Sequence, residues 1–406
     1  ETVIVARIGD LLGGLKGTIV NTVVKYVKKM VPSFNLPNAI PFKQVMAEGK
    51  GKSPSAVTLS HDDMAFLQYT GGTTGVSKGA ILTHGNICSQ LSQIDGWLTG
   101  LFKDGEAVVI TALPLYHIFA LTANCITFFN YGARNVLITN PRDMPAFIKD
   151  LKKNPFSLIT GVNTLFNGLL NQPEFLKLDF SDLKISLGGG MAVQDAVAKK
   201  WQEVTGSPLL EAYGLSETSP AATINPTDGT HRMGTIGLPI PNTDLKIFDD
   251  DRKEVPIGER GEIGIKGPQV MAGYWNRADA TKEVMHGDYF LTGDIGIMDE
   301  DGFFKIVDRK KEMVCVSGFN VYPSEVEAVV SSHPKVLEVG VRSEPSAKTT
   351  ECVMAFVVKK DESLTEQEVR DFCREKLTAY KVPKIVVFRD ELPKSNVGKI
   401  LRRKLV

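Results

Sequence analysis

Residues 69–80, YTGGTTGVSKGA, constrain the chain most, because four glycines and four hydroxyl side chains share one short loop. Glycine tolerates positive φ and lets backbone N–H groups approach an oxyanion closely, while hydroxyl groups add hydrogen-bond donors. The residues that supply these groups around one cation, Lys78, are Thr70, Gly71, Gly72, Thr73, Thr74, Gly75, Ser77 and Gly79. A plain hairpin between strands near 66–69 and 81–82 needs neither the hydroxyls nor the lysine. The pattern predicts a phosphate-binding loop.

The spacing of this loop differs from the Walker A pattern. Val76 and Ser77 separate Gly75 from the lysine, and Gly79 stands where that pattern has serine or threonine. A kinase-type phosphate loop is therefore disfavoured.

Composition narrows the class of protein. A chain of 406 residues exceeds what one hydrophobic core usually supports, so we expect at least two domains. The 47 basic and 47 acidic residues cancel, which disfavours nucleic acid as a partner. The five cysteines include no C-x-x-C pair, as expected in a reducing compartment without a zinc site, and we predict a cytoplasmic protein. No apolar run reaches the roughly eighteen residues that cross a bilayer.

Residues 16–31 predict an amphipathic helix that ends at Pro32. Ile19, Val23, Val27 and Met30 share one face, with lysines nearby. Such a helix either packs its apolar face on its own domain or lies on an anionic membrane surface, and the sequence leaves both open. Residues 47–61, rich in glycine, lysine and serine, predict a loop.

The order of elements predicts an α/β fold. Short apolar strands near 136–138, 158–159 and 183–187 alternate with helices near 143–153 and 193–204, which is typical of a doubly wound sheet. Residues 234–275, rich in glycine and proline, predict a small β subdomain with strands at 244–248 and 261–266.

A second αβ pattern begins near residue 322. Strands near 336–342 and 352–358 are followed by a helix over 365–379 with Thr365 as its N-cap. Ser324 and Glu327 have the spacing of a capping box at the start of the preceding helix. These elements predict a small C-terminal domain.

Four further motifs carry side chains suited to chemistry. His117 follows a buried strand that stops at Pro114, and either faces a pocket or is a satisfied core histidine. Three glycines, Gly188–Gly190, directly follow a strand and would let a flat ligand approach the backbone. The segment 211–220, EAYGLSETSP, offers an aromatic face, a hydroxyl and a carboxylate. Lys399 lies in a glycine-containing loop near the C-terminus.

Together with YTGGTTGVSKGA and the TGD motif at 292–294, these motifs resemble those of the adenylate-forming enzymes, and specifically of the long-chain acyl-CoA synthetases. The resemblance covers residues 64–406 through motifs in the family's order. It implies a large domain over 1–308, with doubly wound sheets and a small β subdomain, followed by a small mobile α+β domain over 309–406. It also leads us to expect a longer stretch before the phosphate loop than this chain contains.

The resemblance assigns roles to individual residues. It places Gly189 and Gly190 against adenine, Asp294 and Arg309 on the ribose hydroxyls, Thr70 and Glu217 on Mg²⁺, and His117 at the acyl carboxylate. It makes Lys399 catalytic and Lys311 the hinge between the domains. It adds nucleotide or CoA contacts from Glu211, Ala212, Tyr213, Gly214, Ser216, Ser317, Gly318 and Asn320.

The implied reaction joins a long-chain fatty acid to CoA through an acyl-AMP intermediate, with ATP and Mg²⁺ required. Two alternatives stay open: a fatty-acyl-AMP ligase that loads a carrier protein, and a non-catalytic protein that binds acyl groups or nucleotides. Chain-length preference and oligomeric state, a homodimer included, are not determined by the sequence.

Overall fold

Two units, Glu1–Leu59 and Ser60–Val406, make up the chain in a computed structural model that describes residues 2–70, 77–346, 348–395 and 398–406. In the first unit, β1 (Ile4–Val5) pairs in parallel with β2 (Ile40–Pro41). The helix predicted over 16–31 forms as α1 (Gly14–Thr22), which a π-helical turn continues to Val27, so it ends before the predicted stop at Pro32. The loop predicted over 47–61 begins too early, because α2 extends from Phe42 to Gly49.

The apolar side chains of the predicted amphipathic segment are largely exposed. Ile19, Val27 and Met30 are each more than half accessible. Within the described residues, no helix has the length and apolar character needed to cross a membrane. Contact of this segment with a membrane surface stays a prediction.

A seven-stranded sheet is the centre of the second unit, in the order β11-β10-β9-β8-β7-β5-β6. Five of its strands are parallel, and β10 and β11 form an antiparallel edge. The strands are β5 (Val108–Thr111), β6 (Arg134–Leu137), β7 (Leu158–Gly161), β8 (Ile185–Gly188), β9 (Leu209–Gly214), β10 (Ala221–Ile224) and β11 (Leu238–Pro239).

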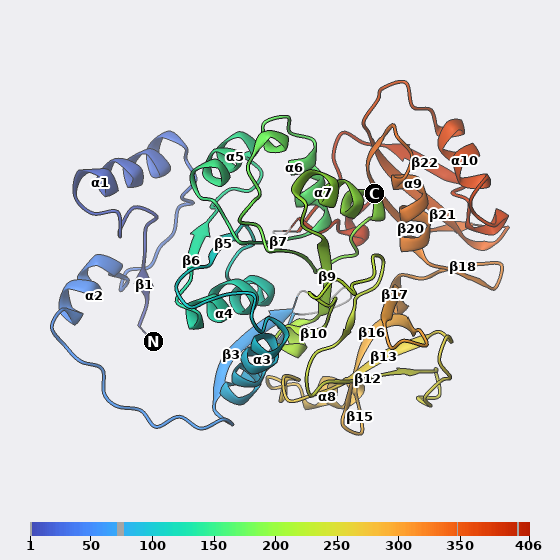
Figure 1. Ribbon diagram of the computed structural model, residues 1–406. Helices are drawn as coiled ribbons and strands as arrows, with labels where there is room; N and C mark the ends of the chain where they lie inside the picture. The colour runs from blue at the N-terminus through green and yellow to red at the C-terminus, as the bar shows by residue number, and fades with distance from the viewer. Residues whose placement is uncertain (1, 71–76, 347, 396–397) are drawn as a thin grey trace. The chain divides into compact units, whose positions relative to one another are not determined.

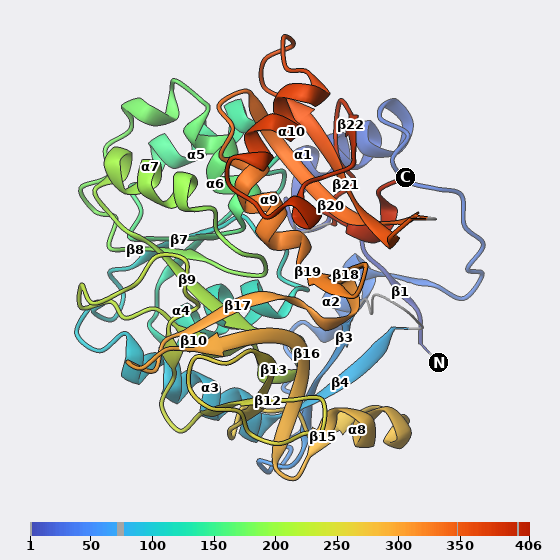
Figure 2. The ribbon, with the colours of Figure 1, turned by 90° about the vertical axis from the view of Figure 1, so that its right-hand side faces the viewer.

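Helices cover both faces of this sheet (Figures 1 and 2). Because successive side chains of a strand point to opposite faces, Ile110 and Ile159 enter one core while Val109 and Leu158 enter the other. The first face is covered by α5 (Met144–Lys153), α6 (Asn163–Leu170) and α7 (Asp195–Thr205), and the second by α3 (His84–Trp97) and α4 (Thr127–Asn130). The doubly wound prediction is confirmed.

The strand order places a topological switch point between β5 and β7. From β5 the chain crosses to β6 on one side, whereas from β7 it continues to β8 and β9 on the other side. In open α/β sheets, ligands bind in the crevice at the carboxyl ends of strands that flank such a point. The segments that follow β5, β7, β8 and β9 are therefore brought to one edge, and these include His117, Gly189 and Glu217.

Two antiparallel sheets flank this edge. β3 (Met64–Thr70), β4 (Lys78–Thr83) and β14 (Gly273–Tyr274) form a three-stranded sheet, and the predicted phosphate loop joins β3 to β4. The β subdomain predicted over 234–275 forms as a five-stranded sheet, but three of its strands follow residue 275, while β11 and β14 belong to other sheets. Its strands are β12 (Asp244–Phe248), β13 (Gly261–Lys266), β15 (Met285–His286), β16 (Tyr289–Met298) and β17 (Phe304–Arg309), with α8 (Ala278–Val284) before β15.

The C-terminal part has a sheet and a valine-rich core of its own. It contains β18 (Val314–Val316), β19 (Phe319–Val321), α9 (Pro323–Ser331), β20 (Val336–Ser346), β21 (Thr350–Lys359), α10 (Glu366–Arg374) and β22 (Ile385–Phe388). Thr365 caps α10 by accepting a hydrogen bond from the Glu368 N–H at 3.2 Å, as predicted.

The capping box predicted for Ser324 and Glu327 is wrong. Proline occupies the first position of α9, the N-cap residue is Tyr322, and no side chain of that residue caps the helix. The Ser324 hydroxyl and the Glu327 carboxylate instead accept hydrogen bonds from Arg402.

Candidate active site

A cavity of about 750 Å³ opens at the edge marked by the switch point. Its wall combines the loops that follow β5, β8 and β9 with residues of β4, β16, the β17 end and the C-terminal loop. The predicted site residues that line it are Thr70, Lys78, His117, Gly189, Gly190, Ala212, Tyr213, Gly214, Ser216, Glu217, Asp294, Arg309, Lys311 and Lys399. Gly71, Gly72, Thr73, Thr74 and Gly75 lie outside the described residues.

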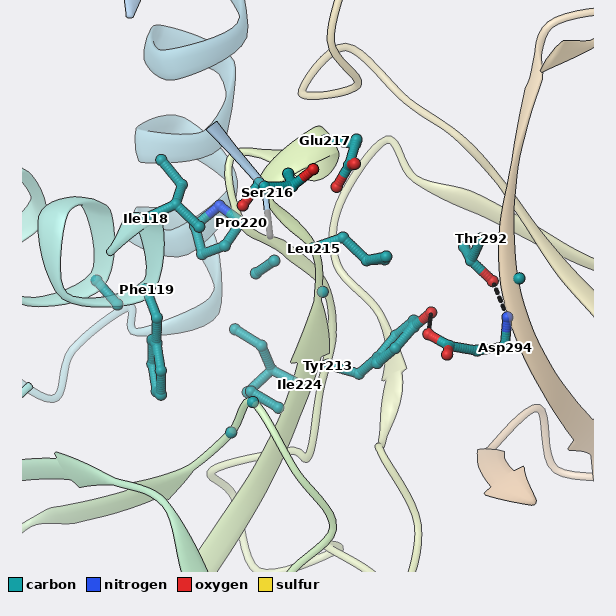
Figure 3. A pocket seen from close by; sticks show the side chains of 18 of the residues that line it. Ile118, Phe119, Tyr213, Leu215, Ser216, Glu217, Pro220, Ile224, Thr292 and Asp294 are labelled. Atoms are coloured by element: carbon teal, nitrogen blue, oxygen red, sulfur yellow. Dashed lines mark hydrogen bonds between the residues drawn. The ribbon is translucent and has the colours of Figure 1, made fainter. Parts of the chain in front are cut away.

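Tyr213, Asp294 and Arg309 are linked in this wall by a hydrogen bond and an ion pair. The Tyr213 hydroxyl donates to Asp294 Oδ2 at 2.7 Å, and Arg309 Nε lies 3.2 Å from Asp294 Oδ1. Tyr213 and Asp294 point toward each other from β9 and β16 (Figure 3). Burial raises the pKa of Asp294, although Arg309 and Tyr213 act in the opposite direction. An aromatic ring, a carboxylate and a guanidinium thus lie together in the cavity wall.

Each glycine of the triple-glycine turn occupies a position where a side chain is disfavoured. A Cβ at Gly188 would lie 2.6 Å from Val193 Cγ2, and one at Gly189 would lie 3.0 Å from the Phe119 ring. Gly190 has φ of +76°, which disfavours a side chain. The turn thus keeps the backbone of β8 close to the cavity.

Glu217 and Lys78 both interact with the side chain of Tyr274. The Tyr274 hydroxyl donates to Glu217 Oε1 at 2.7 Å, and Lys78 Nζ lies 5.0 Å from the Tyr274 ring centroid. Burial raises the pKa of Glu217. Tyr274 also lines the cavity. Our sequence reasoning missed this residue, because no feature of β14 distinguishes it from an ordinary core tyrosine.

His117 lies in the segment that follows β5, half-buried in the cavity wall. Its Nδ1 accepts a hydrogen bond from the Phe119 N–H at 3.3 Å. Burial, together with the charge of Lys399, lowers the pKa of His117. The imidazole is therefore neutral at pH 7 and carries its proton on Nε2, where it can be donated to a ligand.

Lys399 reaches the cavity from the C-terminal part of the chain. The preceding carbonyl, that of Gly398, accepts a hydrogen bond from Thr164 Oγ1 of α6 at 3.0 Å, and the Lys399 N–H donates to Ser395 Oγ at 3.2 Å. Burial, together with the charge of Arg309, lowers the pKa of Lys399 to about 8. In this arrangement the ammonium group shares the cavity with Asp294 and His117.

Four predicted residues are not part of the cavity wall. Ser317 and Gly318, with φ of +53° and +84°, form the two-residue turn of the β18–β19 hairpin, and Asn320 is exposed on β19. Glu211 is buried, and its two carboxylate oxygens accept hydrogen bonds from the N–H groups of Val193 and Gly234, each at 3.1 Å. Glu211 thus joins the loop after β8 to the chain before β11.

This role predicts an effect of pH on stability. Burial raises the pKa of Glu211 from 4.5 to about 7. Between these two pKa values the folded chain holds a proton on Glu211 that the unfolded chain has released. The free energy of unfolding therefore falls as pH rises through this range, by about 3 kcal/mol in total. Glu211→Gln cannot titrate and should lack this fall. Urea unfolding of both proteins across this pH range tests this, and parallel pH dependences would contradict it.

An apolar arm extends the cavity between the sheet and α3 and α4. Its lining side chains belong to the core on that face of the sheet: Ile94, Leu98, Phe128, Leu158 and Ile185. Our sequence reasoning did not identify these residues, because they are scattered over four elements and each looks like ordinary core.

The fold and the cavity define an adenylate-forming enzyme, and comparison with known proteins agrees. The model of the AMP-binding enzymes matches residues 16–275, and the model of the AMP-binding enzyme C-terminal domain matches residues 325–399.

Solved structures and curated relatives narrow the class. ATP-bound MatB from Rhodopseudomonas palustris superposes with a TM-score of 0.81 at 32% identity, over 90% of this chain and 73% of that one. MenE from Bacillus subtilis with ATP and magnesium superposes with a TM-score of 0.78 at 28% identity, over 90% of this chain and 75% of that one. The long-chain-fatty-acid–CoA ligase of Escherichia coli O6:H1 is 57% identical over 405 residues, which cover 100% of this chain and 72% of the relative. The chain belongs to the family of long-chain-fatty-acid–CoA ligases.

Proposed function

We propose that this protein activates long-chain fatty acids to acyl-CoA at the cavity described above. The observation that carries the proposal is the continuity of one cavity from Asp294 and Lys399 to the apolar arm. In the first step a carboxylate oxygen attacks the α-phosphorus of ATP, the bond to pyrophosphate breaks, and acyl-AMP forms. In the second step the thiolate of CoA attacks the acyl carbon, and AMP leaves.

Neither step requires a protein nucleophile, so the chain contributes positioning and charge. Asp294 accepts hydrogen bonds from the ribose hydroxyls, and Arg309 holds that carboxylate in place. His117 donates from Nε2 to the acyl carboxylate. The Lys399 ammonium stabilises the negative charge that develops on the phosphate oxygens.

Thr70 and Glu217 are the residues that we propose for Mg²⁺. Both residues line the cavity and carry side-chain oxygen atoms, the donor type that this ion prefers. No group of three or more His, Cys, Asp or Glu side chains suited to a metal occurs in the part of the chain that the structure describes. This fits an ion held by one carboxylate and the phosphates of the substrate. When bound, the ion supplies neutralisation of phosphate charge.

The apolar arm predicts that Ile94→Phe narrows the range of acids used. Each buried methylene of the acyl chain contributes about 0.8 kcal/mol to its binding in the arm. A phenylalanine that displaces two or more of these methylenes should therefore reduce kcat/KM for a long-chain acid about tenfold or more. The value for a medium-chain acid should change little. The matched control is Ile148→Phe, on the opposite face of the sheet, because both isoleucines are similarly buried but only Ile94 lines the cavity. Equal losses for both acid lengths would contradict the assignment of the arm.

Two measurements separate this function from the alternatives. Release of pyrophosphate that depends on fatty acid distinguishes an enzyme from a protein that only binds nucleotide or acyl groups. Formation of a thioester with free CoA distinguishes a synthetase from a ligase that loads a carrier protein. Absence of either product with the purified chain would overturn the corresponding part of the proposal.

A further inference from the structure

Arg402, three residues beyond Lys399, is the centre of a hydrogen-bonded cluster. Nη1 donates to Asp308 Oδ1 at 2.8 Å and to Glu312 Oε2 at 2.6 Å. Nη2 donates to Ser324 Oγ at 2.7 Å and to Glu327 Oε2, and Nε donates to Glu327 Oε1 at 2.8 Å. All five N–H groups of the guanidinium are therefore used. Only 15% of the Arg402 side chain is exposed, so the cluster is largely shielded from water.

Asp308 differs from the other members of this cluster by its place in the chain. It belongs to β17, before Lys311, whereas Glu312, Ser324 and Glu327 follow that residue. Its second oxygen, Oδ2, accepts a hydrogen bond from the Ser324 N–H at 2.6 Å. Asp308 therefore caps α9, whose N-cap residue has no side-chain hydrogen bond of its own. It also connects the five-stranded sheet, to which β17 belongs, to the C-terminal part.

Short-range backbone hydrogen bonds hold Lys399 and Leu401, which precede Arg402 in the chain. The Ser395 N–H donates to the Lys399 carbonyl at 2.8 Å, and the Leu401 N–H donates to the Pro393 carbonyl at 2.8 Å. A guanidinium fixed to Asp308 thus limits how far the loop that carries Lys399 can move from the cavity. The hydrogen bond from Thr164 to the Gly398 carbonyl is a second restraint on the same loop.

We propose that Asp308 and Arg402 form a positioning pair that holds Lys399 in the cavity for acyl-AMP formation. Neither side chain contacts the reacting atoms. The pair acts by favouring the arrangement of the C-terminal part in which Lys399 lies beside Asp294. This inference rests on the proposed function, in which Lys399 serves the first step.

The test measures the two steps separately in Asp308→Asn and Arg402→Lys. Asparagine keeps the shape of Asp308 but not its charge, and lysine keeps the charge of Arg402 but not its planar fork. Pyrophosphate release from ATP and fatty acid should fall about tenfold or more, while thioester formation from synthetic acyl-AMP and CoA should change less than about threefold.

The matched control for these variants is Glu338→Gln. It removes a carboxylate whose Oε1 lies 2.6 Å from Nζ of Lys394, a residue near Lys399 in the chain. Both partners follow Lys311 in the sequence, so this ion pair, unlike that of Asp308 and Arg402, lies within the C-terminal part. Both steps should keep their rates in this variant. Equal losses in both steps for the Asp308 and Arg402 variants, or no loss in either, would overturn the proposal.

A second readout does not depend on activity. Acetic anhydride labels accessible amines, and peptide mass spectrometry reports the labelling of Lys399 relative to the exposed Lys404 of the same tail. This ratio should rise about threefold or more in Arg402→Lys and stay unchanged in Glu338→Gln. An unchanged ratio in Arg402→Lys would overturn the positioning role. If the native protein releases no pyrophosphate but the ratio rises as expected, the proposed function fails while the positioning pair stands.

Discussion

Lys399→Ala should stop acyl-AMP formation while largely sparing the transfer of a preformed acyl group to CoA. An ammonium that contacts the developing charge on phosphorus contributes about 3–5 kcal/mol, or roughly two to four orders of magnitude in rate. Lys399 reaches the cavity from beyond Lys311, and the contact of Gly398 with Thr164 holds it there in this arrangement. As the resemblance implies, we expect the C-terminal part to rotate about Lys311 between the two steps, so Lys399 should serve only the step that uses the arrangement seen here.

The measurement gives the variant ATP and fatty acid in one assay, and synthetic acyl-AMP and CoA in another. Lys404→Ala is the control, since Lys404 is an exposed lysine of the same tail and does not line the cavity. Comparable losses in both assays for Lys399→Ala would show that the lysine serves both steps or stability.

Glu217→Gln should reduce pyrophosphate formation by about two orders of magnitude or more and weaken the apparent affinity for Mg²⁺. Glutamine keeps an acceptor for the Tyr274 hydroxyl but removes the negative charge that we propose for the ion. Because burial raises the pKa of Glu217, its ionised form carries a desolvation cost that glutamine lacks. The fold should therefore be at least as stable as before.

Titration of Mg²⁺ at saturating ATP and fatty acid, with thermal unfolding of both proteins, tests this prediction. Tyr274→Phe is the matched comparison, because it removes the hydrogen bond to Glu217 and keeps the carboxylate. Its loss of rate should be much smaller than that of Glu217→Gln. Pyrophosphate formation with an unchanged dependence on Mg²⁺ in Glu217→Gln would exclude this residue from the ion site.

Local sequence patterns determined the elements and the order of the motifs. Strands predicted at 244–248 and 261–266 have those bounds in the structure, and Thr365 caps its helix as predicted. These features depend on residues close in the chain, through alternation of apolar side chains or a cap three residues away. The same holds for the α/β class, since alternating strands and helices admit few topologies.

Tertiary structure alone decided what several of these residues do. Glu211 lies inside a nucleotide motif, yet its carboxylate binds the backbone of Val193 and Gly234. Ser324 and Glu327 have the spacing of a capping box, yet both side chains accept hydrogen bonds from Arg402. The physical reason is that Pro323 begins the helix, so Ser324 lies inside its first turn, and that a guanidinium is a strong partner for a carboxylate. Arg402 lies 75 positions after Glu327 in the sequence, and only the folded chain brings the two side chains together.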